Sequence, residues 1–211
     1  MSASSWKCVA STYFLPRQDQ NRFLSKPYGF DVGYLETFLE TAGTQRGFVT
    51  VADADALGVP SVELRKMAAR GVLERRGHGL YRIAAFAAQG NDELMEAALW
   101  FGLGGVISHQ SALGLWGLAA VNPRRIDVTV ARRVRRTGGE TYRLWIAELP
   151  PSEIDHHEGI PVTTPRRSII DASRTGTDPR LIAQAIRTAE RHDHISRSDA
   201  DSLSTQTRWT T

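Results

Sequence analysis

Residues 48–83 combine short helices and strands in an order that restricts the fold more than any other segment does. Thr50 precedes a helical pattern and stands three residues before Asp53, which is the spacing of a capping box at a helix N-terminus. The sequence Gly58-Val59-Pro60 then predicts a tight turn before a second helix. Two short helices joined by a glycine-containing turn are typical of a helix-turn-helix.

A β-hairpin is expected directly after the second of these helices. Residues 72–75 and 80–83 have the composition of strands, and two glycines between them allow a tight turn. An amphipathic helix over residues 31–42 precedes the whole arrangement. The complete order is helix, short strand, helix, turn, helix, hairpin, and it predicts a winged helix-turn-helix over residues 31–88.

The charges of this region are divided between its two halves. Residues 31–64 carry one arginine against six carboxylates, a net charge of −5, whereas residues 65–90 carry six basic residues against Glu74, a net charge of +5. The basic residues fall on the hairpin and on the second helix of the helix-turn-helix, the one after the turn at residues 58–60. This second helix is the recognition helix, and these two elements are expected to contact DNA. We therefore predict DNA-binding residues at Ser61, Arg65, Lys66, Arg70, Arg75, Arg76, His78 and Arg82. The competing interpretation is a protein-protein module with a solvated basic face.

The recognition helix is expected to turn one face inward and one face outward. Its apolar residues, Val62 among them, are spaced for burial, and Ser61, Arg65, Lys66 and Ala69 are expected to face outward. Pro60 occupies the position before Ser61, so Ser61 is expected to cap the helix in its place.

Length and composition limit the class of protein. The chain has 211 residues, enough for one ordinary domain or two small ones. Its single cysteine, Cys8, excludes an internal disulfide and a cysteine-based zinc cage. No apolar run approaches the roughly 18 residues of a membrane span, and the N-terminus lacks the layout of a signal peptide. We expect a cytoplasmic protein that makes no use of a membrane.

The chain after residue 88 is expected to form a second domain of the α+β class. Helical patterns begin at Asn91 and at Ser108, and strands are predicted over 126–130, 142–146 and 159–164. We expect these helices to pack beside a small, mostly antiparallel sheet. The predicted organisation is a flexible or loosely packed arm over 1–30, the winged helix over 31–88, the α+β domain over 89–195 and a polar tail over 196–211.

Three segments resemble the AbiEi-type antitoxins of type IV toxin-antitoxin systems. They are Gly47–Ile83, Ile107–Leu113 with the following Gly117-Leu118, and Gly159–Asp171. The resemblance covers most of residues 33–175 but gives no counterpart for the arm. It implies a partner toxin that resembles a nucleotidyltransferase and is encoded beside this chain. It also implies repression of the shared promoter through the winged helix, which would be autoregulation by operator binding.

An arginine-rich segment separates the predicted strands 126–130 and 142–146 as a basic hairpin or loop. In an antitoxin this segment could meet an acidic toxin surface or RNA. The candidate toxin- or RNA-binding residues are Arg132, Arg133, Arg135 and Arg136. No heptad or apolar stripe indicates how two copies would pair, so the oligomeric state stays open.

No strong catalytic motif is present, and we predict neither a metal nor a cofactor. The glycine-rich residues 101–105 fit neither a dinucleotide fingerprint nor a phosphate loop. Residues 155–158 contain two adjacent histidines, which we interpret as a solvated loop and not as a metal site.

Two alternatives to a non-enzymatic antitoxin stay open. One is an enzyme that inactivates the toxin covalently, an atypical Ser/Thr protein kinase that would use ATP and Mg²⁺. Its candidate residues are Ser108, His109, Arg166, Arg167 and Asp171. The structural interpretation of the same residues is that Ser108 caps a helix and Asp171 accepts from Arg166 or Arg167. The other alternative is a transcription regulator whose second domain senses a ligand.

Overall fold

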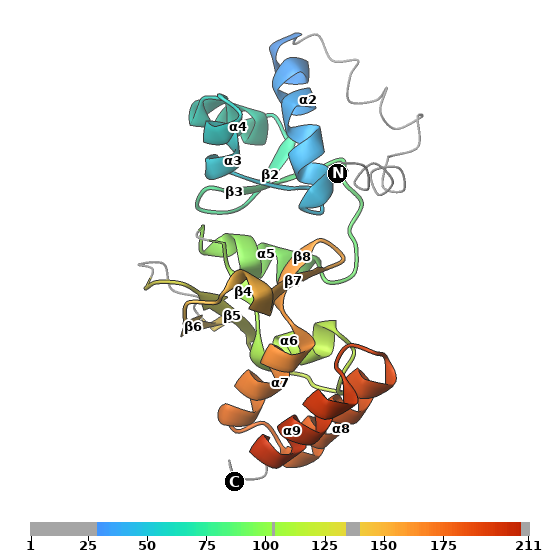
Figure 1. The fold of residues 1–211 in the computed structure, drawn as a ribbon. Coiled ribbons are helices and arrows are strands. Elements are labelled where there is room, and N and C mark those ends of the chain that lie inside the picture. The colour runs from blue at the N-terminus through green and yellow to red at the C-terminus, as the bar shows by residue number, and fades with distance from the viewer. Residues whose placement is uncertain (1–28, 103, 134–139, 208–211) are drawn as a thin grey trace. The chain divides into compact units, whose positions relative to one another are not determined.

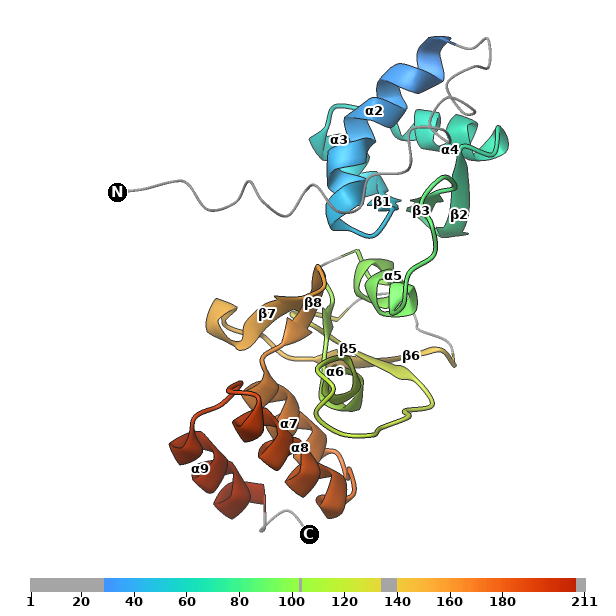
Figure 2. The ribbon, with the colours of Figure 1, turned by 90° about the vertical axis from the view of Figure 1, so that its right-hand side faces the viewer.

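The computed structural model describes residues 29–102, 104–133 and 140–207. The chain divides into two compact units, Met1–Gly90 and Asn91–Thr211, here called unit 1 and unit 2 (Figures 1 and 2). The expected arm over 1–30 lies almost wholly outside the described residues. Within the described ranges, no helix combines the length and the apolar character that crossing a membrane requires.

The described residues of unit 1 form three helices and a small antiparallel sheet, which confirms the predicted order of elements. The elements are α2 (Gly29–Thr44), β1 (Phe48–Thr50), α3 (Val51–Ala56), α4 (Ser61–Ala69), β2 (Leu73–Gly77) and β3 (Leu80–Ile83). The strands lie in the order β1-β3-β2, and β2 and β3 form the expected hairpin (Figure 2). Phe38, Val49, Leu64, Met67 and Ile83 are part of one core that joins the helices to the sheet.

The junction between β1 and α3 is the capping box that the sequence predicts. The hydroxyl oxygen of Thr50 accepts from the backbone N–H of Asp53 at 3.1 Å, and the Asp53 carboxylate accepts from the backbone N–H of Thr50 at 2.7 Å. The start of α4 differs from the expectation. Pro60 is the N-cap residue, no side chain caps the helix, and Ser61 is already helical. The Pro60 carbonyl accepts from the Glu63 N–H at 2.8 Å, so backbone atoms alone close this first turn.

Unit 2 contains a five-stranded mixed sheet, and its helices and strands confirm the α+β class. The strands are β4 (Val106–Ile107), β5 (Ile126–Val130), β6 (Tyr142–Ile146), β7 (Ile154–His157) and β8 (Ile160–Thr163), in the order β6-β5-β4-β8-β7. The β4–β5 and β7–β8 pairs are antiparallel, whereas the β5–β6 and β4–β8 pairs are parallel.

Three expectations about this sheet differ in detail from the structure. The sheet is not mostly antiparallel, because two of its strand pairs are parallel. Of the two alternatives expected for the arginine-rich segment, a hairpin or a loop, the hairpin is wrong because β5 and β6 run in the same direction. Side-chain alternation has the same period in both strand directions, so it does not determine how two strands pair. The expected loop over 155–158 lies largely in β7, an edge strand of the sheet. An exposed edge strand can be as polar as a loop.

The helices of unit 2 are α5 (Asp92–Trp100), α6 (His109–Leu115), α7 (Pro165–Arg174), α8 (Pro179–Arg191) and α9 (Arg197–Thr207), with a short 3-10 helix at Pro151–Glu153. The helices α7, α8 and α9 lie side by side in both views (Figures 1 and 2). They share a core with α6 that includes Leu113, Ile169, Ile182, Ile186 and Leu203.

The expected polar tail over 196–211 is wrong for residues 197–207. These residues form α9, in which Ala200 and Leu203 are buried at 4% and 0% exposure. Two apolar positions three residues apart in an otherwise polar sequence give only a weak helical signal, although they suffice to attach the helix to α7 and α8.

Candidate functional site

The outward face of α4 carries a stripe of four exposed residues. Val62, Arg65, Lys66 and Ala69 follow one another at helical spacing and are all exposed, whereas Leu64 lies in the core of unit 1. Ser61 lies at the N-terminal end of the helix and is half-buried.

The expectation that Val62 is buried is wrong. This residue is 40% exposed. The helical period carries the signal that could have shown this. Positions 62, 65, 66 and 69 lie on one side of a helix, and positions 64, 67 and 68 lie on the other.

The basic residues of α4 differ in their hydrogen-bond and ion-pair partners. The Nζ atom of Lys66 lies 2.8 Å from a carboxylate oxygen of Glu63 in the same helix. Arg65 makes no hydrogen bond or ion pair with any residue that the structure describes. Arg70, at the C-cap of α4, is exposed. Arg65 therefore presents an uncompensated guanidinium from the middle of the stripe.

The β2–β3 hairpin presents a second exposed group of cations. Arg75, Arg76 and His78 are all exposed around the turn, and Arg75 donates from Nε to the carbonyl of Gly77 at 3.3 Å. These side chains extend from a sheet whose strands are fixed by backbone pairing. The hairpin can therefore hold positive charge at a defined place.

Arg82 behaves differently from the other predicted DNA-binding residues. It is half-buried, and its guanidinium carbon lies 5.7 Å from the centre of the Phe48 ring. It also donates to the carbonyl of Ala87 at 3.0 Å. These contacts are within unit 1 and indicate that Arg82 supports the sheet.

The sheet of unit 2 has an apolar face and a polar face at β5 and β6. On the apolar face, the Tyr142 ring lies 5.4 Å from Trp100 and 6.1 Å from Phe101, at the C-terminal end of α5. Successive residues of a strand point to opposite faces. Asp127 and Thr129 therefore share the other face, where each is 1% exposed and linked to residues at the start of α6.

His109 lies at the centre of this polar face. Its ring is stacked on Trp145, with centroids 4.1 Å apart and planes at 16°. Its Nδ1 atom lies 2.9 Å from the hydroxyl oxygen of Ser108, which accepts from Thr129 at 2.8 Å. The Trp145 indole N–H donates to Asp127 at 2.9 Å. These five residues form one network, called here the His109 cluster.

The protonation of His109 follows from its surroundings. Burial lowers the pKa of His109 to about 4, and the positive charges of Arg167 and Arg143 act in the same direction. The imidazole is therefore neutral near pH 7. Ser108 accepts from Thr129 and also shares a hydrogen bond with His109 Nδ1, whose direction is set by the tautomer of the neutral imidazole.

The His109 cluster resembles a serine-histidine pair but lacks an open approach. Ser108 has 0% exposure, and His109 has 7%. Although Ser108 is the N-cap residue of α6, its side chain makes no capping hydrogen bond, so the expected capping role is wrong. The hydrogen bonds and the ring stacking instead hold α6 against β5 and β6. This supports a structural role for Ser108 and His109.

Arg167 joins two carboxylates from separate elements. Its Nε atom lies 2.8 Å from both carboxylate oxygens of Asp171, and its Nη1 atom donates to Glu153. Burial raises the pKa of Asp171, and the hydrogen bond from Arg167 opposes this shift. Arg166 instead faces Asp199 at 3.5 Å. Of the two arginines considered as partners of Asp171, the structure selects Arg167.

The five candidates of the enzymatic alternative thus fall into three places. Ser108 and His109 belong to the His109 cluster, Arg167 and Asp171 form an ion pair, and Arg166 pairs with α9. Sequence reasoning missed Asp127, Thr129 and Trp145, which the register of β5 and β6 brings together. It also missed Glu153, which the short 3-10 helix places against Arg167. Across the described ranges, no group of three or more His, Cys, Asp or Glu residues could hold a metal ion.

The arginine-rich segment is described only in part. Arg132 and Arg133 are exposed just after β5. Arg135 and Arg136 lie outside the described residues.

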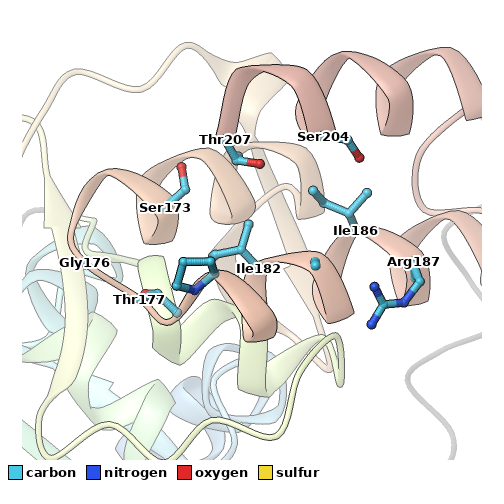
Figure 3. Close-up of a pocket in the computed structure, with 10 residues that line it drawn as sticks. Ser173, Gly176, Thr177, Ile182, Ile186, Arg187, Ser204 and Thr207 are labelled. Carbon is cyan, nitrogen blue, oxygen red and sulfur yellow. The ribbon is translucent and has the colours of Figure 1, made fainter. Parts of the chain in front are cut away.

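A cavity of about 520 Å³ is lined by residues of α7, α8 and α9 (Figure 3). Ile182 and Ile186 contribute apolar surface, and Arg187 contributes a charge. Ser173 and Thr207 also line it, but their hydroxyls donate to carbonyls of their own helices. These two hydroxyls are therefore already engaged within their own helices.

Comparison with known proteins assigns both units to one family. Residues 37–84 match a model described as transcriptional regulator, AbiEi antitoxin, and residues 104–207 match the AbiEi antitoxin C-terminal domain. The chain is also similar to the crystal structure of the RV2827C protein from Mycobacterium tuberculosis, with 14% identity and a TM-score of 0.44 over 78% of this chain and 79% of that chain. A search of curated proteins finds no match.

The two matches cover the regions that the sequence resemblance identified. The first spans most of the helix-turn-helix and the hairpin, and the second spans the mixed sheet and the helices α6 to α9. The chain therefore belongs to the AbiEi antitoxin family, with an N-terminal transcriptional-regulator domain and an AbiEi antitoxin C-terminal domain.

Proposed function

We propose that this antitoxin neutralises a nucleotidyltransferase-like toxin encoded beside it and represses their shared promoter through unit 1. Family membership supports a cognate toxin and a DNA target in general terms. The particular toxin and promoter are part of the proposal.

The observation that carries promoter binding is the position of the exposed cations in unit 1. Arg65 and Arg70 lie on or just after α4, and Arg75 and Arg76 lie on the hairpin, all with exposed side chains. A recognition helix enters the major groove of DNA, while flanking cations contact phosphates. We assign the same role to His78 and a lesser one to Lys66, whose charge is partly balanced by Glu63. Arg82 is removed from the proposed interface because its contacts are internal.

For neutralisation, we propose that the exposed arginines after β5 contact the toxin or its RNA. Arg132 and Arg133 support this by their exposure, and the sequence places two more arginines nearby. Nucleotidyltransferases act on phosphate-bearing substrates, so a basic segment could meet either an acidic enzyme surface or a nucleic acid.

Promoter binding is tested by titrating the full chain into a labelled fragment from upstream of its own gene, with unrelated DNA as competitor. The expected result is sequence-specific binding that the double variant R65A/R70A abolishes. Specific binding that survives both substitutions would show that α4 is not the recognition helix.

Neutralisation is tested by expressing the adjacent toxin with and without this chain and measuring growth and the intact mass of the toxin. Restored growth with an unchanged toxin mass supports neutralisation without modification. A mass gain of roughly 80 Da, the size of one phosphate group, would replace this proposal with the covalent alternative. Growth that is not restored would overturn the antitoxin assignment for this pair.

A further inference from the structure

We propose that Val62 and Arg65 together read a thymine and a neighbouring guanine in the major groove of the operator. The inference rests on the DNA binding proposed for unit 1 and names the bases that α4 recognises. It assigns a specificity role to an apolar residue outside the basic set.

Val62 is unusual among the apolar residues of the described chain. Only four large apolar side chains are exposed there, and Val62, at 40%, is the one on the stripe of α4 that also carries Arg65. It is the second residue of the helix, in the N-terminal half that approaches base edges in a helix-turn-helix. A single exposed valine is ordinary on a protein surface. Val62, however, lies beside the uncompensated Arg65 on the recognition helix, and this position allows it to contact a DNA base.

The chemistry of the two side chains matches a definite pair of bases. Arginine donates two hydrogen bonds to O6 and N7 of guanine, and an apolar side chain contacts the C5-methyl group of thymine. Three residues of an α-helix rise about 4.5 Å, and successive base pairs are separated by about 3.4 Å. Val62 and Arg65 are therefore spaced to contact adjacent or next-nearest base pairs.

Neighbouring residues explain why these two positions are selected. Lys66 lies on the same stripe, but Glu63 holds its ammonium at 2.8 Å, so it is less available for a base edge. Ala69 is exposed and too short to reach far from the helix. Of the two cations on the stripe, Arg65 is the one without a partner among the residues described.

DNA fits this surface better than an apolar partner protein does. The stripe has one large apolar side chain. Arg65 at its middle and Arg70 at the C-cap of α4 add positive charge. A stable protein interface needs a larger contiguous apolar centre. An anionic groove with isolated methyl groups matches both the charge and the single valine.

The test replaces each thymine of the operator, one at a time, by deoxyuridine, which lacks only the methyl group. The wild-type chain is expected to bind one such operator about fourfold more weakly, the effect of one lost apolar carbon contact of about 0.8 kcal/mol. Replacing a guanine one or two base pairs away by 7-deazaguanine is expected to weaken binding about tenfold through the loss of the N7 acceptor.

The variants identify which side chain is responsible. V62A is expected to bind the thymine and deoxyuridine operators equally, and R65A is expected to lose the response to 7-deazaguanine. L57A is the matched control, because Leu57 is 39% exposed at the C-cap of α3 and lies outside the stripe. It should keep both responses. A thermal melt of each variant confirms that unit 1 is folded.

Two failures are distinguishable. If the wild-type chain binds the promoter specifically but no deoxyuridine weakens it, or if V62A keeps the full methyl response, the assignment of Val62 is wrong and promoter binding stands. If the wild-type chain shows no specific binding, the proposed function of unit 1 and this inference are both overturned.

Discussion

The imidazole of His109 lies flat against the indole of Trp145, with ring centroids 4.1 Å apart and an angle of 16° between the planes. The two residues come from α6 and β6, and Asp127 fixes the indole by accepting its N–H at 2.9 Å. The guanidinium carbon of Arg143 lies 5.9 Å from the Trp145 ring centre. Protonating His109 would place a buried cation near this arginine and Arg167, so the neutral ring is part of the folded state.

The first prediction concerns stability at acidic pH. The pKa of His109 is about 4 in the folded chain against an ordinary value of 6.5, so between these values the unfolded chain binds a proton that the folded chain does not. The free energy of unfolding should therefore fall as the pH falls from about 6.5 to about 4, by on the order of 2–3 kcal/mol. Urea unfolding at pH 7, 5 and 4 measures this loss.

His109→Asn is the control for this pH effect. Asparagine tolerates the positive φ of 52° at this position, and its side-chain amide can donate or accept a hydrogen bond with Ser108. Burial raises the pKa of Asp127 and Asp171, so their titration opposes that of His109, but it is present in both proteins. An unchanged pH dependence in the variant would show that His109 is not the group responsible.

The second prediction concerns Arg167, which holds Asp171 and Glu153. Arg167→Gln should lower the free energy of unfolding by about 2–3 kcal/mol, since it leaves partly buried carboxylates without their cation. The double variant R167Q/D171N should recover part of this loss because one of the unpaired charges is gone. Urea unfolding at pH 7 provides the measurement.

Arg166→Gln is the matched control, because its pair with Asp199 is about half exposed on both sides. Exposed pairs contribute little, so this variant should unfold like the wild-type chain. Equal losses for the two arginines would contradict the distinction drawn from their burial.

The third prediction separates base reading from phosphate contact in unit 1. If the interface contacts about five phosphates, the logarithm of the binding constant should fall against the logarithm of the salt concentration with a slope near −4 to −5. R75A/R76A should reduce the steepness by about 2 and weaken all sequences alike. Titrations at several salt concentrations with operator and unrelated DNA test this. A variant that changes sequence preference would instead place the hairpin against the bases.

The fourth prediction concerns the exposed arginines after β5. Replacing Arg132 and Arg133 by glutamate should impair neutralisation of the toxin in a growth assay and leave promoter binding unchanged. The control replaces Arg124 and Arg125, which are also exposed and lie before β5, so the change of charge is the same. If growth is protected equally by both variants, the segment after β5 is a solvated surface.

Sequence reasoning succeeded where the structure is determined by local chemistry. Thr50 and Asp53 form their capping box through atoms three residues apart, and the β2–β3 hairpin follows from its glycines and flanking strands. Both features depend on hydrogen bonds between near neighbours in the chain. The family resemblance likewise rested on contiguous segments, and the matches confirm it.

Features that depend on contacts between residues far apart in the sequence could not be predicted from the sequence. The stacking of His109 on Trp145 depends on β6 aligning with β5 so that Trp145 lies opposite Thr129. The sequence limited the partner of Asp171 to two adjacent arginines, but the packing of α7 decided between them. Its hydrophobicity predicts Val62 in the core, whereas its helical position places it on the exposed side of α4.

The two unlike faces of the sheet in unit 2 also act as a check on strand alignment during folding. A slip of β6 by one residue against β5 would move Trp145 and Arg143 to the side of Tyr142 and α5 and send Leu144 among the polar groups. The indole donor would lose Asp127, and a guanidinium would have to enter an apolar layer. A shift in register therefore destabilises both faces of β6. For this reason β5 and β6, a parallel pair without a short connecting turn, still adopt a single register.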